Sequence, residues 1–441
     1  MWNNVTGPGT SSGVQLTPIA NPTGDPGAMP VIPPNLHFLD NSTLTALRQA
    51  LLQAPALRLW CDEAFDGTHT EQVRNDVVTL MFYYRYGDDG PPPGDALEPR
   101  ETAVARLVDR LSPAGKEALK QSLAPNVAPT PFAQHLAPRD RWTLAGCVYR
   151  QDGFVSLAEE NCQAAVECFL DAARCFANVP GQAPWVADLY RCAGTACAAG
   201  QDWEAAAGQF LTAATLDAKH AMALSTRAPP QPGDAAASRE ALTRAARDMT
   251  GAGSLYQASG KPAFALLANT FAASAWVDLA FYPEAASLFI AIADIWTKSA
   301  QAYYETGQLP LAEVAAVKAY NAAQEAASYC SKNEDYFAAA HILMAVYDDE
   351  GAAEAFKLGG DPRAAGLCYL ALGQRYEALA AAKLELPEAH SLRQQAVAFY
   401  ERAHTELAEN TEDPVDGPRY AEASILALAR LNALQDALQA P

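Results

Sequence analysis

The stretch that decides the fold runs from Ile295 to Ala312 and reads IWTKSAQAYYETGQLPLA. Its aromatic and small residues stand at helical intervals before Gly307, and a second helical pattern begins at Pro310. Glycine readily takes the left-handed conformation that ends a helix, and proline, which lacks an N–H, suits the first turn of the next helix. The stretch therefore predicts a helix, a tight turn and the start of a second helix. The residues expected to form the contacts between them are Trp296, Ala300, Tyr303 and Ala312.

The same turn recurs twice along the chain. The intervals around Gly307 are repeated around Gly260 and around Gly360, and each glycine is followed by a proline. The aligned positions are Tyr256, Gly260 and Ala265, then Tyr303, Gly307 and Ala312, then Phe356, Gly360 and Ala365. Looser copies precede them around Tyr149 and Tyr190. A recurring turn of this kind predicts an array of helical repeats.

These residues resemble the tetratricopeptide repeat, in which W-x2-L-G-x2-Y precedes A-x3-F. Trp296, Ala300 and Tyr303 fit its first half, while Ala316 stands where the second half has an aromatic residue. The key alanines at 165, 206, 265, 312 and 365 are 41, 59, 47 and 53 residues apart, longer than the usual repeat of about 34. An inserted loop, APPQPGD, explains part of the longest interval, and longer helices are expected to explain the rest.

Arrays of long helices look like the soluble NSF-attachment proteins (SNAP family), and the resemblance covers residues 141–440. It implies an all-α fold, a right-handed α-α solenoid. We expect four regions: a disordered tail at 1–36, a small helical module at 41–123, a proline-rich linker at 124–140 and the solenoid at 141–440. The module, which contains LTALRQALLQAPALRLWCDEAF, faintly resembles the effector-associated adaptor domains of bacterial conflict systems, which implies like-with-like docking.

Two apolar segments raise the question of membrane contact. The uncharged run from Pro262 to Val277 is shorter than the roughly 20 residues that a span requires, so we expect buried helices of the array there. The aromatic segment TLMFYYRYGDD, which starts at Thr79, is expected to pack in the core of the N-terminal module. Its alternative is a peripheral contact with a membrane or a partner.

The chain is strongly acidic. It has 31 Lys and Arg against 51 Asp and Glu, a net charge of −20 and a pI of about 4.7. Such a surface repels phosphate backbones, so nucleic acid is not an expected partner. Acidic clusters can attract a basic protein or only keep the chain soluble. No Lys or Arg precedes Arg48, and no continuous apolar run stands near the start, so we expect a cytoplasmic protein without a secretory signal.

The motifs predict no cofactor and no catalytic residue. The sequence has no P-loop, GxSxG elbow or HExxH helix, and Glu401 and His404 form only one E-x-x-H where a di-iron site needs two. Six of the nine cysteines lie between 147 and 197: Cys147, Cys162, Cys168, Cys175, Cys192 and Cys197. Without a CxxC pair they are typical of small buried residues. A metal- or thiol-dependent enzyme using this segment is the alternative.

We therefore expect a non-enzymatic scaffold or adaptor that presents a helical-repeat groove to a protein or peptide partner. The candidate groove residues are Tyr304, Asn321, Tyr329 and Tyr336. In the SNAP family a C-terminal leucine near acidic residues engages an AAA+ ATPase, a role that the resemblance assigns to Leu434 or Leu438 beside Asp436. The alternative function is then a SNAP-like adaptor that recruits an AAA+ or other ATPase in a bacterial defence system.

Overall fold

The computed structural model describes residues 41–65, 71–86, 100–123, 136, 138–383, 386–408 and 417–439. These residues form 18 α-helices and one isolated β-bridge, between Phe65 and Leu111, which confirms the expected all-α solenoid. The expected tail at 1–36 and most of the expected linker lie outside the described residues.

The helices of the N-terminal block are α1 (Asn41–Gln53), α2 (Pro55–Ala64), α3 (Glu71–Tyr86), α4 (Arg100–Arg110) and α5 (Pro113–Gln121). The helices of the array are α7 (Pro138–Ala158), α8 (Cys162–Ala177), α9 (Ala183–Ala199), α10 (Trp203–Ser225), α11 (Asp234–Ala258), α12 (Pro262–Asp278), α13 (Tyr282–Glu305), α14 (Leu309–Lys332), α15 (Tyr336–Ala345), α16 (Asp349–Leu358), α17 (Pro362–Ala382), α18 (Leu386–Ala408) and α19 (Gly417–Gln439).

The described residues divide into two compact units between Gly200 and Gln201. In the first unit, large aliphatic side chains of α1–α5 form a core that continues onto α7 through Leu144 and Val148. Leu80, Met81 and Phe82 are buried there, as expected for core packing, and Tyr83 is half-buried. The block and α7 thus share one core, and a domain boundary near residue 140 stays a prediction.

Polar contacts join the block to α7 as well. Arg100 of α4 donates from Nε to Oδ1 of the buried Asp140 at 2.6 Å, and Lys120 of α5 pairs with Asp152 at 2.7 Å. Because Asp140 is removed from water, its charge requires a cationic partner. The first turn of α7 is therefore fixed by the first turn of α4.

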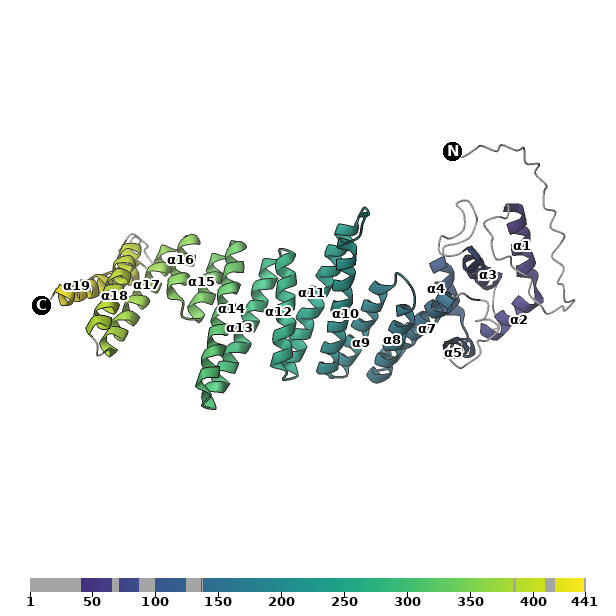
Figure 1. Ribbon diagram of the computed structural model, residues 1–441, viewed down its shortest axis with the longest axis horizontal. Helices are drawn as coiled ribbons and strands as arrows, with labels where there is room; N and C mark the ends of the chain where they lie inside the picture. Colours follow the sequence, from purple (N-terminus) through teal and green to yellow (C-terminus); the bar gives the residue numbers. More distant parts are fainter. Residues whose placement is uncertain are drawn as a thin grey trace, which may run out of the picture. The chain divides into compact units, whose positions relative to one another are not determined.

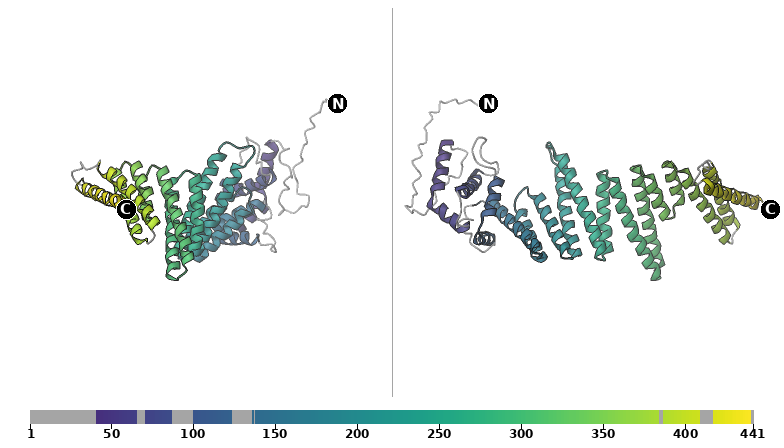
Figure 2. Two further views of the ribbon diagram at one scale, coloured as in Figure 1. Left: turned by 60° about the vertical axis from the view of Figure 1, so that its left-hand side comes forward. Right: turned by 180° about the vertical axis from the view of Figure 1, so that it is seen from behind.

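Within the second unit the helices follow one another as packed neighbours (Figures 1 and 2). Their contacts are made largely by alanine, as in the buried run Ala319, Ala322, Ala323, Ala326 and Ala327 of α14. Glycines allow the closest approaches, since a Cβ on Gly373 would lie 2.8 Å from the ring of Tyr400. The high alanine content of the chain therefore serves close helix packing.

Eight joins between consecutive helices share one geometry. In each, one residue has a positive φ between 59° and 79°, and the next residue caps the following helix. The positive-φ residues are Glu160, Gln201, Gly260, Ala280, Gly307, Glu334, Tyr347 and Gly360. Four positions after each cap stands a buried alanine: Ala165, Ala206, Ala265, Ala285, Ala312, Ala339, Ala352 and Ala365. Its N–H donates to the cap carbonyl at 2.9 to 3.3 Å. The turn, more than the helix pair, is the repeated unit.

The helix count corrects the expected period. Two helices, α12 and α13, separate Ala265 from Ala312, whereas three helices, α14, α15 and α16, separate Ala312 from Ala365. Helices α15 and α16 have only 10 residues each, so longer helices do not explain this interval. Because each tight turn reverses the chain direction, α17 runs opposite to α14. The turns at Gly307 and Gly360 therefore have the same local geometry, although the helices that follow them run in opposite directions.

Candidate protein-docking surface

Helix α12 exposes a stripe of large apolar side chains. Phe264, Leu267 and Phe271 stand at i, i+3 and i+7, which places them on one side of the helix, and they are 51%, 54% and 56% exposed. The adjoining side is buried, largely through Ala265, Ala268 and other small residues. The expected burial therefore holds for one side of α12, through small residues and Trp276, while Phe264, Leu267 and Phe271 remain about half exposed.

Helix α14 exposes a matching stripe of Leu311, Val314 and Val317, each about half exposed. Both helices follow the repeated turn, so their positions can be aligned on Ala265 and Ala312. Phe264 then corresponds to Leu311 and Leu267 to Val314, whereas Phe271 corresponds to Lys318, next to Val317. Since one helix separates α12 from α14, the two run in the same direction and present equivalent sides.

We define the α12–α14 apolar face as Phe264, Leu267, Phe271, Leu311, Val314 and Val317. The next equivalent helices continue it at one position only, where Leu358 of α16 aligns with Phe271 and is 68% exposed. At the position of Leu267, α10 carries Gly208 and α16 carries the exposed Glu354. The apolar face therefore ends at α10 and extends toward α16 only through Leu358, and exposed apolar groups of this kind are typical of interaction sites.

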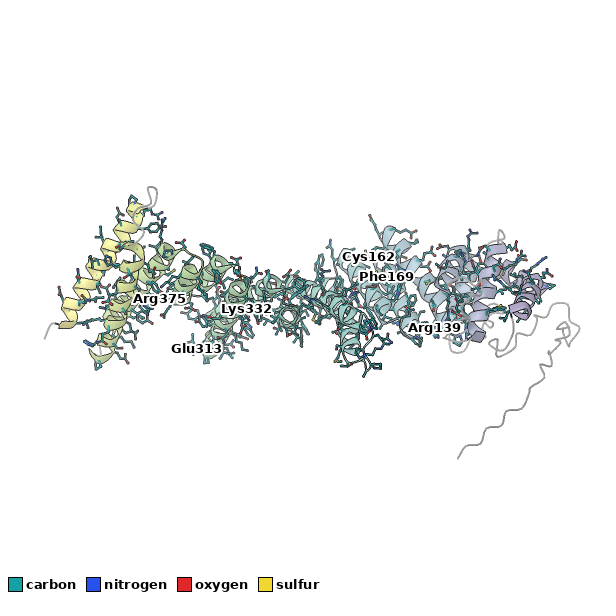
Figure 3. The ribbon with its side chains drawn as sticks, turned by 90° about the horizontal axis from the view of Figure 1, so that it is seen from above. Arg139, Cys162, Phe169, Glu313, Lys332 and Arg375 are labelled. Carbon is teal, nitrogen blue, oxygen red and sulfur yellow. The ribbon has the colours of Figure 1, made fainter. Side chains whose placement is uncertain are left out.

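The surroundings of this face are acidic. Glu313 and Glu325 are exposed on α14, and Figure 3 labels Glu313. Residues 201–441 carry 17 Lys and Arg against 30 Asp and Glu, a net charge of −13. One cation of α14 is already engaged, because the Lys318 ammonium lies 4.3 Å from the ring centroid of Trp296. The field around the face therefore favours a partner with positive charges.

Two of the expected groove residues lie near this face. Asn321 is exposed and stands seven residues after Val314 on α14, so it extends the same side of the helix. Tyr304 is 69% exposed in the last turn of α13, and its carbonyl accepts the N–H of Gly307 at 3.0 Å. The tyrosine ring thus projects from the turn that leads into α14.

Tyr329 and Tyr336 have packing contacts instead. The Tyr329 ring stacks on Tyr282 and Phe289 with centroid distances of 6.0 and 5.5 Å, and the Lys332 ammonium, labelled in Figure 3, lies 4.5 Å from it. Burial raises the pKa of the Tyr329 hydroxyl. Tyr336 is half-buried at the start of α15, close to Gly359. The structure does not bring these two residues to the α12–α14 apolar face.

The expected C-terminal docking residues lie on α19 and differ in exposure. Leu434 is buried in the core that α19 shares with α18, whereas Asp436 is exposed and Leu438 is half-buried. Leu434 therefore has a packing contact, and the groups open to a partner at this end are Asp436 and Leu438.

The expected repeat positions are placed as follows. Tyr256 and Phe356 are buried, while Trp296, Ala300 and Tyr303 are half-buried. Gly260, Gly307 and Gly360 have φ values of 72°, 74° and 79°. Ala265, Ala312 and Ala365 are buried at the start of the next helix.

In the cysteine-rich segment, burial disfavours ionisation of four of the six thiols. Burial raises the pKa of Cys147 to about 11 and that of Cys175 to about 12, and it also raises the pKa of Cys168 and Cys192. The thiolate, which is the form that attacks and binds metals, is disfavoured at these positions. In the described part of the chain, no group of three or more His, Cys, Asp or Glu is arranged to hold a metal ion.

Sequence reasoning missed the α12–α14 apolar face, although a signal was available. Once Ala265 and Ala312 are aligned on their turns, the large apolar residues fall beside the buried alanines, on the outer side.

None of the helices described is both long enough and apolar enough to cross a membrane.

No protein-family model matches the chain, and no curated protein matches it. Three solved structures are similar to it at low identity. BtubC (BKLC) from P. vanneervenii is 13% identical with a TM-score of 0.28, over 62% of this chain and 88% of that one.

A circular tandem repeat protein with a novel repeat topology is also 13% identical with a TM-score of 0.28, over 90% of this chain and 93% of that one. The Rap conjugation gene regulator of plasmid pLS20, solved in complex with the Phr* peptide, is 12% identical with a TM-score of 0.26, over 83% of this chain and 98% of that one. At such TM-scores none of them carries an argument about function.

Proposed function

We propose that the chain is a non-enzymatic scaffold that binds a basic amphipathic helix of a protein partner on the α12–α14 apolar face. The observation that carries the proposal is the recurrence of half-exposed large apolar side chains at two aligned positions of these helices, Phe264 with Leu311 and Leu267 with Val314. The same two positions hold small or charged residues in α10 and α16. An amphipathic helix buries its apolar side in such a place through residues at i, i+3, i+4 and i+7.

Charge supports the choice of a basic partner. The net charge of −13 for residues 201–441 attracts lysine and arginine on the polar side of such a helix and repels acidic helices. Burial of the apolar side then supplies affinity, and the acidic surroundings supply selectivity and a faster association rate.

The test is a selection of displayed helical peptides, about as long as α12, against the full chain. Selected peptides should combine a helical apolar stripe with an excess of Lys and Arg. Their affinity should fall at least about tenfold, equivalent to about 1.4 kcal/mol, for the double variant Leu267→Glu and Val314→Glu.

The matched control is Leu379→Glu, a similarly exposed leucine on α17 outside this face. Circular dichroism should show unchanged helix content in both variants. If the selected peptides bind the double variant as tightly as the unmodified chain, the proposed surface is wrong. Enrichment of acidic peptides would contradict the proposed partner chemistry.

A second candidate function is that of a SNAP-like adaptor for an AAA+ or other ATPase in a bacterial defence system. The exposed Asp436 and the half-buried Leu438 in the last turn of α19 favour it. The chain should co-purify with an ATPase encoded beside its gene when a non-hydrolysable ATP analogue is present. The double variant Asp436→Lys and Leu438→Glu should lose this co-purification. Co-purification should survive Glu422→Lys, an exposed change on the same helix. The docking role of the N-terminal module also stays a prediction.

A further inference from the structure

A cavity of about 220 Å³ lies in the first unit, between α4, α7, α8 and α9. The described residues that line it include three arginines, Arg100, Arg139 and Arg150, and no aspartate or glutamate. Arg100 is paired with Asp140. Phe176, Trp185 and Val104 supply apolar wall area. The cavity thus combines positive charge with apolar surface inside a single compact unit.

The helical period of α7 explains why these groups meet. Arg139, Thr143, Cys147 and Arg150 stand at i, i+4, i+8 and i+11, which is one side of a helix. Arg100 comes from the first turn of α4 and is held by its contact with the buried Asp140. Arg139, labelled in Figure 3, lies in the first turn of α7.

Arg150 is held by aromatic rings. Its guanidinium carbon lies 5.1 Å from the ring centroid of Trp185 and 5.6 Å from that of Phe154. Among the residues that the structure describes, no carboxylate forms an ion pair with Arg150. Stacking on rings fixes the planar guanidinium and leaves its N–H groups free to meet a ligand.

Asp140 offsets the charge of Arg100, whereas no carboxylate among the described residues offsets that of Arg150. Thr143 is uncharged, and its hydroxyl donates to the carbonyl of Arg139 at 2.8 Å. Burial raises the pKa of Cys147 to about 11, so its thiol is protonated at neutral pH. Residues 1–200 contain 14 Lys and Arg against 21 Asp and Glu. The charge of Arg150, which no described carboxylate pairs, is therefore a local exception to the net negative charge of the first unit.

We infer that this cavity binds a small organic anion, a compound with one phosphate or carboxylate group on a compact apolar body. Guanidinium forks match both anionic groups with paired hydrogen bonds, and the rings and Val104 contact the apolar body. The volume equals that of about seven waters at roughly 30 Å³ each, so it suits a small molecule and excludes a folded segment.

Binding should stabilise the first unit. Helix α4 belongs to the N-terminal block, whereas α7, α8 and α9 belong to the array, and the ligand would contact both within this unit. A ligand that binds only the folded state raises its stability in proportion to the logarithm of ligand concentration above Kd. The cavity is separate from the α12–α14 apolar face, so this inference does not rest on the proposed function.

The test uses the full chain with phenyl phosphate and benzoate as anionic probes and phenol as the neutral probe. Isothermal titration calorimetry should show saturable binding of at least one anion and none of phenol, and that anion should raise the melting temperature. The preferred anion then identifies the ligand as a phosphate ester or as a carboxylate.

Arg150→Gln should weaken binding of that anion at least tenfold. Ala105→Leu fills the cavity from an exposed position on α4 and should weaken binding of the anion by a similar factor without removing a charge. It is the second test variant if Arg150→Gln does not fold. Arg174→Gln removes an exposed arginine of α8 outside the cavity and should leave affinity unchanged. Absence of saturable binding of either anion at millimolar concentration overturns the inference, and so does an equal loss in Arg174→Gln.

Discussion

The helices of the N-terminal block pack through leucine, valine and phenylalanine, whereas those of the array pack largely through alanine and glycine. In the block, side chains from several helices meet in one core. In the array, each helix contacts mainly its neighbours in the sequence, and the turn fixes where the first buried alanine lies. The difference teaches that the block depends on side-chain volume, while the array depends on backbone proximity and turn geometry.

The largest effect is expected for volume lost from the block. Leu57 of α2 is fully buried, so Leu57→Ala should lower the free energy of unfolding by about 2–5 kcal/mol through lost burial and a residual cavity. Urea unfolding followed by circular dichroism measures it. Leu59→Ala, two residues on but 59% exposed, should stay within about 0.5 kcal/mol. Equal losses for both would mean that the block is not packed as described.

A smaller effect is expected for volume added to the array. Ala312 of α14 is buried against its neighbours, so Ala312→Trp should overpack the contact and lower the free energy of unfolding by about 1–3 kcal/mol or somewhat more. Thermal unfolding of the full chain measures the change. Ala316→Trp, one helical turn on and exposed, is the control and should have little effect. An unchanged melting curve for Ala312→Trp would show that the assignment of buried and exposed positions on α14 is wrong.

The smallest effects, of opposite sign, are expected at the turns. Gly307 has a φ of 74°, and a Cβ added there would have no atom within 4 Å, so Gly307→Ala should destabilise by about 1–2 kcal/mol through backbone strain alone. Glu334 has a φ of 61° at the equivalent position, so Glu334→Gly should stabilise by up to about 1 kcal/mol. Differential scanning calorimetry compares both with the unmodified chain. The same sign for both would show that the two turns are not equivalent.

The turns also show what the sequence can predict. Gly260, Gly307 and Gly360 reveal three of them, because glycine marks a left-handed helix end. The other five have Glu160, Gln201, Ala280, Glu334 or Tyr347 at that position, residues that seldom take a positive φ. The looser copies with key alanines at 165 and 206 indicate the first two of these joins. The other three are recognised from the buried alanine and the hydrogen bonds of the whole join, which only the structure displays.

The candidate site was less predictable for a related reason. Apolar residues at helical spacing normally indicate a buried side, so Phe264, Leu267 and Phe271 gave the signal of a core. In α12, alanines occupy most of the core side instead. Because this alanine side and the exposed side with Phe264, Leu267 and Phe271 are both apolar, hydrophobicity alone does not show which one is buried. The positions of Tyr304 and Asn321, by contrast, follow from their places beside the turn and on α14.

The repeated turn also bears on how the chain reaches its fold. Every join of this kind closes through hydrogen bonds between residues at most five positions apart, such as Gln308 N–H to Tyr303 C=O at 2.8 Å. Contacts between sequence neighbours form with little loss of loop entropy, and chains rich in them fold quickly. We therefore expect the array to assemble one helix at a time in the order of synthesis, with each new helix docking on a finished one before the rest of the chain has left the ribosome.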